Sequence, residues 1–96
     1  MIFTFHPLAK IELNDAAVYY DYQQKGLGLD FIEEIYATIK RILQFPKAWS
    51  KLSKNTFRCL VNRYPYGIIY QIKKNEIRII AIMHLNRKPG YWQRRI

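Results

Sequence analysis

Cysteine and histidine are scarce in this sequence, and their scarcity excludes several kinds of site. Cys59 is the one cysteine, so no internal disulfide can form. It lies in a strand-like run, where we expect a small core residue. The two histidines, His6 and His84, are far apart in the sequence and do not have the spacing of zinc ligands. We therefore expect no bound metal.

The signatures of several common catalytic sites are also missing. The four glycines form no glycine-rich phosphate loop, and no serine lies in a nucleophile elbow. Glu33 and Glu34 are adjacent on a predicted helix, so their side chains do not face each other as an acid–base pair. We expect neither a cofactor nor a small-molecule substrate.

Long apolar runs are lacking as well. The longest uninterrupted one, residues 79–83, is far short of the roughly 20 residues that a membrane helix needs. The first ten residues, MIFTFHPLAK, have no cationic segment before their short apolar stretch, unlike a secretory signal peptide. We expect a soluble cytoplasmic protein that does not bind membranes.

Acidic residues almost disappear from the second half of the chain. Residues 49–96 carry eleven Lys and Arg but one acid, Glu76, a balance of +10, whereas residues 1–48 have a balance of −1. Such asymmetry favours a polyanionic or acidic protein partner, although a solvated basic face is the simpler alternative. If a partner binds there, we expect these cations to form one contiguous patch.

The 96 residues, half of them hydrophobic, fit a single domain covering residues 1–96. Residues 2–5 are β-like, and three-to-four spacing of apolar residues predicts helices over 8–24 and 29–45. Two glycines place a turn at residues 25–30 between them. On the second helix, one apolar face is expected to be buried; it comprises Phe31, Ile35, Ile39 and Ile42.

The remainder of the chain is predicted to be a loop followed by strands. Residues 47–55 form the loop, and strands cover 56–64, 68–73 and 76–84, with Lys74 and Asn75 as a hairpin turn. The order is β-α-α-β-β-β, an α+β fold in which a helical hairpin packs on an antiparallel sheet with a short C-terminal tail. We expect the first strand to pair with a later one, and the exposed sheet face and the tail to hold the positive charge.

The tail combines a histidine, cations and aromatic rings within a few residues of a strand end. His84 titrates near neutral pH and could move a proton. Tyr91 has an ordinary pKa near 10, which nearby arginines would lower. With cations on the phosphate, such groups would suffice for metal-free cleavage of RNA through its 2′-hydroxyl. The candidate catalytic residues are His84, Arg87 and Tyr91, and the candidate phosphate- or target-binding residues are Arg58, Arg63, Lys88, Trp92, Arg94 and Arg95.

Each of these residues also has a structural interpretation. A single histidine at a strand end is often a hydrogen-bonded structural residue, and Trp92 could close the open end of the core. Arg63 precedes the segment YPYG and could pair with a carbonyl or an acid. Arg58 and Arg78 could be ordinary residues of a sheet face. Only the collective charge stands clear of these interpretations.

Three stretches together resemble the RelE/ParE superfamily of toxins from type II toxin–antitoxin pairs. Residues 6–35 look like that family's opening helical hairpin, with its YY, GLG and F positions. Residues 58–72 contain RYPYGIIY, which is similar to its R-[FY]-P-Y-x-[IV]-x-Y strand pair. Residues 77–92 end in the pattern H-x-x-R-x-P-x-x-W, like its last strand. The resemblance covers nearly the whole chain and is closest to ParE-like, plasmid-stabilisation members.

The resemblance implies a toxin that arrests growth when its antitoxin is absent, but it leaves the target open. ParE-type members inhibit DNA gyrase, which needs a shaped surface and no catalytic group. RelE-type members cut mRNA on the ribosome, and their lysine cluster is only partly echoed here by Lys51 and Lys54. A non-toxic remnant that binds antitoxin or RNA is the third alternative. The resemblance also implies a cognate antitoxin, acidic and partly disordered, laid across the sheet and helices.

Overall fold

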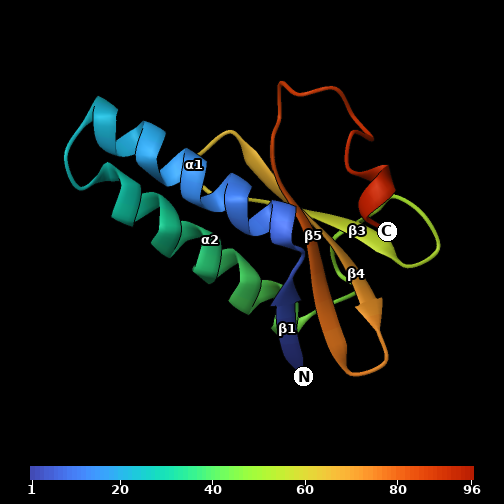
Figure 1. Cartoon of the computed structure of the whole chain (residues 1–96). Helices are drawn as coiled ribbons and strands as arrows, with labels where there is room; N and C mark the ends of the chain where they lie inside the picture. Colours follow the sequence, from blue (N-terminus) through green and yellow to red (C-terminus); the bar gives the residue numbers. More distant parts are fainter.

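The computed structural model describes all residues, 1–96, as two helices packed on a five-stranded sheet (Figure 1). The sheet order is β1-β5-β4-β3-β2. β1 (Ile2–Phe5) runs parallel to β5 (Glu76–His84), and every other neighbouring pair is antiparallel. The α+β class, the helical hairpin and the pairing of the first strand with a later one are thereby confirmed.

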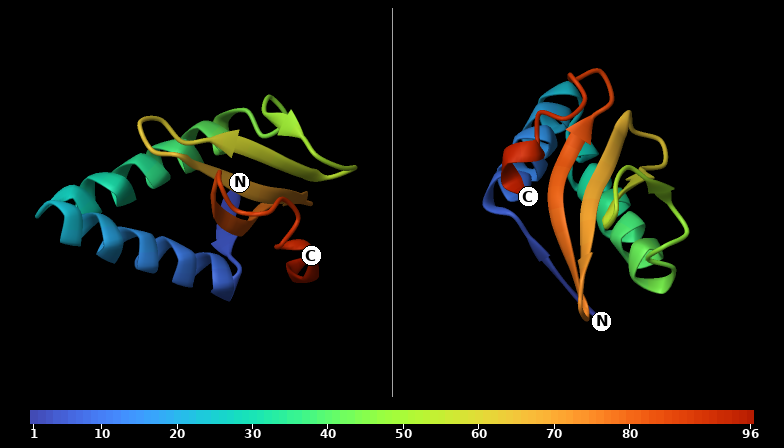
Figure 2. Two further views of the ribbon diagram at one scale, coloured as in Figure 1. Left: turned by 90° about the horizontal axis from the view of Figure 1, so that it is seen from above. Right: turned by 90° about the vertical axis from the view of Figure 1, so that its right-hand side faces the viewer.

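The two helices form an antiparallel hairpin on one face of the sheet (Figures 1 and 2). α1 (Pro7–Gln23) begins with Pro7 in its first turn, and the His6 ring accepts a hydrogen bond from the Leu8 amide at 3.1 Å. α2 (Leu27–Gln44) buries the predicted face, Phe31, Ile35, Ile39 and Ile42. The main core lies between these helices and the inner faces of β3 (Thr56–Leu60), β4 (Tyr66–Lys73) and β5.

The turn between the helices is shorter than the sequence indicates, because only the first of the two glycines belongs to the turn. Gly26 adopts a positive φ of 89° and ends the turn, so α2 begins at Leu27 instead of residue 29. Gly28 already belongs to the helix, and a Cβ there would lie 2.4 Å from the Ala17 carbonyl oxygen. Asp21 accepts hydrogen bonds from both glycine amides and caps α2 from the neighbouring helix.

The strands differ from the prediction at their ends. A two-residue strand, β2 (Ser50–Lys51), pairs with β3 inside the stretch expected to be a loop. β3 ends at Leu60 because the chain turns away before Pro65, and β4 resumes at Tyr66. In the predicted hairpin turn between β4 and β5, Lys74 adopts a positive φ of 52°.

A bulge in β5 changes which side chains face the helices. Ile69 pairs with Ala81 and Tyr70 with Ile79, so Ile80 has no partner on β4. Ile80 and Ala81 therefore both point to the outer face, whereas Ile82 returns to the main core. The side-chain alternation is shifted by one residue for the rest of the strand, up to His84.

The sequence had suggested that the outer face of the sheet is exposed. In the structure, the C-terminal tail covers much of this face. The segment after β5 folds back beside that strand and ends in a short 3-10 helix, η1 (Gln93–Arg95) (Figure 2). Trp92 is buried with a second apolar cluster on this face, formed with Ile69, Ile80, Ala81 and Met83. Neither helix is long and apolar enough to cross a membrane.

Candidate functional site

β5 extends beyond the end of β1. There, side chains form hydrogen bonds with the backbone groups along its edge. The last β1 pair joins Phe5 to Ile79. Further along, the Ile82 amide donates to Glu12 Oε1 at 3.0 Å, and the Ile80 carbonyl accepts from Arg95 Nη1 at 3.1 Å. Glu12 and Arg95 thus replace the missing strand and satisfy backbone groups that would otherwise be unpaired.

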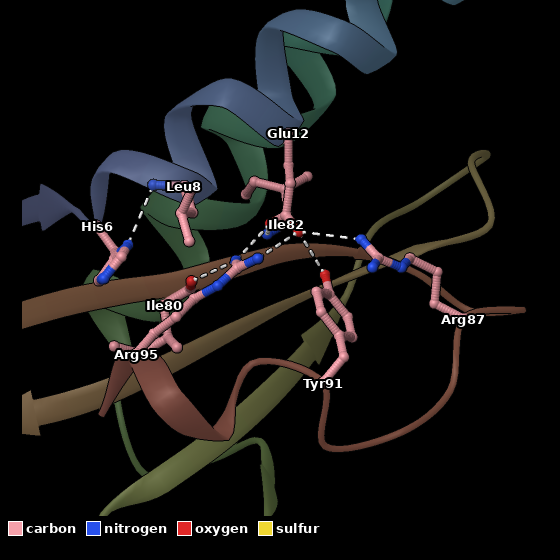
Figure 3. Close-up of polar contacts among 8 residues, drawn as sticks. All are labelled: His6, Leu8, Glu12, Ile80, Ile82, Arg87, Tyr91 and Arg95. Atoms are coloured by element: carbon pink, nitrogen blue, oxygen red, sulfur yellow. Dashed lines mark hydrogen bonds and ion pairs between the residues drawn. The ribbon is translucent and has the colours of Figure 1, made fainter.

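Glu12 on α1 is the centre of a cluster that fixes the tail (Figure 3). Its carboxylate accepts two hydrogen bonds from the Arg95 guanidinium, at 2.9 and 3.0 Å, and one from the Tyr91 hydroxyl at 2.7 Å. Arg87 approaches the same carboxylate at 3.4 Å. We refer to Glu12, Arg87, Tyr91 and Arg95 as the Glu12 cluster.

The contacts of the Glu12 cluster differ in strength. The side chains of Arg95 and Glu12 are only 10% and 14% exposed, and hydrogen bonding to Glu12 raises the pKa of Arg95. Removing one partner of such a buried pair typically costs about 3–5 kcal/mol. Arg87 is 53% exposed, and a longer ion pair in that setting contributes about 0–1 kcal/mol. Its guanidinium instead lies 3.7 Å from the centre of the Tyr91 ring.

The expected lowering of the Tyr91 pKa is wrong. Burial and the hydrogen bond to Glu12 raise the pKa of this hydroxyl, and together they outweigh the opposing charges of Arg87 and Arg95. The arginines had been expected to act on a free hydroxyl, but their charge is offset by the carboxylate between them. Tyr91 therefore stays protonated at neutral pH and donates a hydrogen bond to Glu12.

His84 lies outside the Glu12 cluster. Its ring packs edge-on against Tyr66, with ring centroids 5.0 Å apart, and its Nδ1 accepts a hydrogen bond from the Asn86 amide at 3.0 Å. The bulge at Ile80 accounts for this placement, because the shifted alternation points His84 to the side of Ile82 and the helices. The structure brings Arg87 and Tyr91 together but joins neither of their side chains to the imidazole by a hydrogen bond.

Arg63 also binds acids within the molecule. Its guanidinium donates to Asp30 at 2.8 Å and to Glu34 at 3.1 Å, both on α2. Asp30 also accepts a hydrogen bond from the Tyr64 hydroxyl. This bond has the largest effect on the pKa of the Asp30 carboxyl, which it lowers together with the hydrogen bond from Arg63. Glu34 therefore takes part in an ion pair with Arg63 and does not only face solvent. Arg63 itself sits at a positive φ of 68° in the turn before β4.

The remaining candidates surround the outer face of the sheet. Lys88 and Arg94 are exposed and form no ion pair, whereas Trp92 is 6% exposed. Arg58 is half-buried on β3, and no acceptor of the protein lies near its Nε. Roles in binding or catalysis for all of these residues stay predictions.

The basic half does not form one contiguous patch, and that prediction is wrong. Arg63 pairs with acids on α2, and Arg78 donates to Thr4 and to the Phe5 carbonyl on β1. Lys73 and Lys74 lie at the hairpin, at the opposite end of β5 from the tail. The exposed cations of the tail itself are Arg87, Lys88 and Arg94.

Glu12 is the residue that sequence reasoning missed. Helical spacing alone allows either Ile11 or Glu12 to face the sheet, and the choice decides whether an acid faces β5. Its partners lie 70 to 83 residues further along the chain, so no local pattern points to them. One signal was available: six of the seven acids lie in the first half and eleven cations in the second, so pairs between the halves were to be expected.

Comparison with known proteins identifies the family. The model of the ParE toxin of type II toxin–antitoxin systems, parDE, matches residues 3–89. This chain belongs to the ParE toxin family. The resemblance seen in the three sequence stretches is thereby confirmed, and the chain is a ParE-type toxin of a type II toxin–antitoxin system.

Solved structures agree with this ParE assignment at the level of the fold. One, described as the chromosomal ParDE TA system from P. aeruginosa, superimposes with a TM-score of 0.77 and 17% sequence identity. The match covers 90% of this chain and 97% of that one. No curated protein matches the sequence.

The ParE-type arrangement is suited to binding. No group of three or more His, Cys, Asp or Glu side chains is placed to hold a metal ion. The tail is fixed at Tyr91 and Arg95 by one carboxylate and at Trp92 by apolar packing. Between and beyond these fixed points it presents exposed cations. Such a surface can dock on an acidic protein without moving a proton.

Proposed function

We propose that this ParE-type toxin arrests growth by binding and blocking DNA gyrase through the surface formed by its C-terminal tail. The observation that carries the proposal is the use of the candidate catalytic groups inside the molecule. Tyr91 donates to Glu12 and has a raised pKa, and His84 packs against Tyr66. An efficient acid–base catalyst needs a pKa near the working pH and contact with the reacting group.

Regulation by a cognate antitoxin follows from the same surface. An acidic, partly disordered antitoxin segment would be drawn to the exposed cations of the tail and fold on binding. The family description and the ParDE system in the similar solved structure support such a partner. Its neutralising effect would consist in covering the tail so that gyrase cannot reach it.

A RelE-like, ribosome-dependent cleavage of mRNA is the second candidate, and one feature favours it. Exposed Lys51 and Lys54 flank the loop residues that form one wall of a cavity beside Arg58. These three cations could contact a phosphate backbone, although no free acid–base group accompanies them. The alternative of a non-toxic remnant requires that neither target be affected.

The test adds the purified protein in parallel to a gyrase supercoiling assay and to a translating extract read by primer extension. We expect loss of supercoiling and uncut mRNA, because the surface binds without catalysing a reaction. Cleaved mRNA with unimpaired supercoiling would replace this proposal by the RelE-like one. No effect in either assay, together with normal growth on strong induction, would favour the remnant.

A further inference from the structure

A cavity of about 310 Å³ lies on the outer face of the sheet, between the tail and the loop after β2. Its residues come from three places: the loop, the outer sides of β3, β4 and β5, and the tail. They are Leu52, Ser53, Arg58, Ile69, Met83, Pro89, Gly90, Trp92 and Gln93. No acidic side chain lines it, and Arg58 is its one cation. We refer to it as the Arg58 cavity.

Two residues of the Arg58 cavity carry buried N–H groups that no acceptor of the protein satisfies. These groups are Nε of Arg58 and Nε1 of Trp92. Leaving a buried donor unpaired destabilises the folded state. Both residues line one cavity, and an acceptor that reached these groups from outside would remove that cost.

Arg58 also lacks a counter-ion, in contrast to other arginines of the chain. Arg63, Arg87 and Arg95 each reach a carboxylate within 3.4 Å. The stem of Arg58 passes so close to Gly67 that a Cβ there would lie 3.2 Å from its Cγ. This packing against β4 fixes the stem, so the half-buried guanidinium is held at the cavity without a partner.

The chemistry of the lining defines the ligand. One guanidinium and one indole N–H match a single negative charge with two acceptor oxygens, which is a carboxylate. Leu52, Ile69 and Met83 offer apolar surface to the carbon atoms around it. A nucleic-acid backbone would bring repeated phosphates and would need Lys51 and Lys54 outside the cavity as well as Arg58. The apolar lining of the cavity itself suits a carboxylate carried by a peptide.

We propose that the Arg58 cavity binds an Asp or Glu side chain of the antitoxin, flanked by apolar residues of the same segment. This inference rests on the antitoxin partner proposed above. It adds the type of antitoxin residue that is recognised and the place on the toxin where that residue binds. The inserted carboxylate accepts from Arg58 and Trp92, and so ties the antitoxin to the tail and the sheet at once. Specificity follows, because an amide in place of the acid loses the charge-assisted bond to Arg58.

The two tryptophans make the cavity directly observable by NMR. The indole N–H of Trp92 reports on the Arg58 cavity, whereas that of Trp49, also unpaired, lies beside a neighbouring pocket that Arg58 also lines. The probe is a short capped peptide of alternating leucine and glutamate, with its glutamine counterpart as the matched control. We expect the glutamate peptide to shift the Trp92 signal saturably and further than the Trp49 signal, because Trp49 lies in the neighbouring pocket. The glutamine peptide should shift neither.

Substitutions test the contacts. Arg58→Met and Trp92→Phe remove one donor each and keep most of the volume, so affinity for the glutamate peptide should fall about tenfold or more. Lys40→Met removes a charge from the solvent face of α2 and should leave affinity within about twofold. If Arg58→Met unfolds, Arg58→Lys keeps a charge but loses the planar fork and should still weaken binding.

The outcomes separate this inference from the proposed function. Equal binding of the two peptides, unchanged affinity of folded Arg58→Met, or displacement of the peptide by single-stranded RNA would overturn the carboxylate site. Inhibition of gyrase by the wild type, with an unresponsive Trp92 signal, would keep the gyrase proposal and refute only this one. Peptide binding without any effect on gyrase would keep the carboxylate site and refute the gyrase proposal.

Discussion

At the scale of single residues, one carboxylate organises the C-terminal end of this molecule. Glu12 accepts hydrogen bonds from two tail residues, Tyr91 and Arg95, and from the backbone amide of Ile82. Burial, followed by the hydrogen bond to this carboxylate, raises the pKa of Tyr91 and so keeps its hydroxyl protonated. The packing that fixes the tail thus also determines the state of this hydroxyl.

Replacing Glu12 by glutamine should destabilise the protein by about 3 kcal/mol, because Arg95 would keep its charge in a buried place without a counter-charge. Thermal and urea unfolding measure the difference. Glu33→Gln, on the exposed side of α2, is the control and should change the free energy of unfolding by less than about 0.5 kcal/mol. A Glu12→Gln protein as stable as this control would refute the central position of Glu12.

Asp30 predicts a dependence of stability on acid pH. Its carboxyl has a lowered pKa in the folded state, through Tyr64 and Arg63, relative to an unfolded value near 3.9. Its stabilising contribution is therefore complete above the unfolded pKa and is lost as pH falls through the lower, folded pKa. The difference in melting temperature between the wild type and Asp30→Asn should be largest at neutral pH, begin to shrink near pH 4 and close only as pH falls below the lower, folded pKa.

The control for this titration is Asp15→Asn, at an exposed carboxylate that forms no ion pair. Its melting temperature should follow that of the wild type throughout. A gap for Asp30→Asn that stays constant from neutral to strongly acid pH would mean that the ion pair and the Tyr64 bond do not stabilise the fold.

At the scale of elements, the sequence predicted the type of each helix and main strand better than the residues at which it begins and ends. Helical periodicity located both helices, and the buried face of α2 was correct because apolar burial determines it. The start of α2 was missed because Gly28 serves close helix packing, which looks like a turn signal in the sequence. The bulge at Ile80 could not be seen in an unbroken apolar run, so the direction of His84 was not predictable either.

Gly28→Ala tests the close approach of the two helices. Without the contact to Ala17, alanine would stabilise a helix by about 1 kcal/mol relative to glycine. With a Cβ at 2.4 Å from a backbone oxygen, the helices must separate, and we expect a net loss of about 1 kcal/mol or more. Lys40→Ala on the exposed side of the same helix should cost nothing measurable by thermal unfolding. A stabilised Gly28→Ala protein would contradict the packing described.

The tail predicts where the target is contacted. Reversing the charge of both Lys88 and Arg94 leaves the Glu12 cluster and Trp92 untouched, and should weaken inhibition of gyrase supercoiling about tenfold or more. The matched control, Lys40→Glu with Lys47→Glu, changes net charge equally on exposed positions away from the tail. Equal weakening by both pairs would mean that overall charge, and not the tail, determines binding.

At the scale of the whole molecule, the net charge of +9 overstates the free positive surface. Several cations of the second half are bound by acids or carbonyls, some of them from the first half. The order of elements predicted the α+β class and the charge asymmetry indicated a partner, but neither could show which cations stay free, because that depends on contacts between residues far apart in the chain. The candidate site stays a prediction, and the expected state of Tyr91 was wrong.

The central claim is that the toxin acts by binding, with no catalytic group. The most direct measurement is growth arrest on induction of His84→Ala beside the wild type, at matched expression and with folding verified by circular dichroism. Our account predicts arrest of similar strength, because the imidazole packs against Tyr66 and contacts no target. Complete loss of arrest by a folded, equally expressed His84→Ala protein would contradict it.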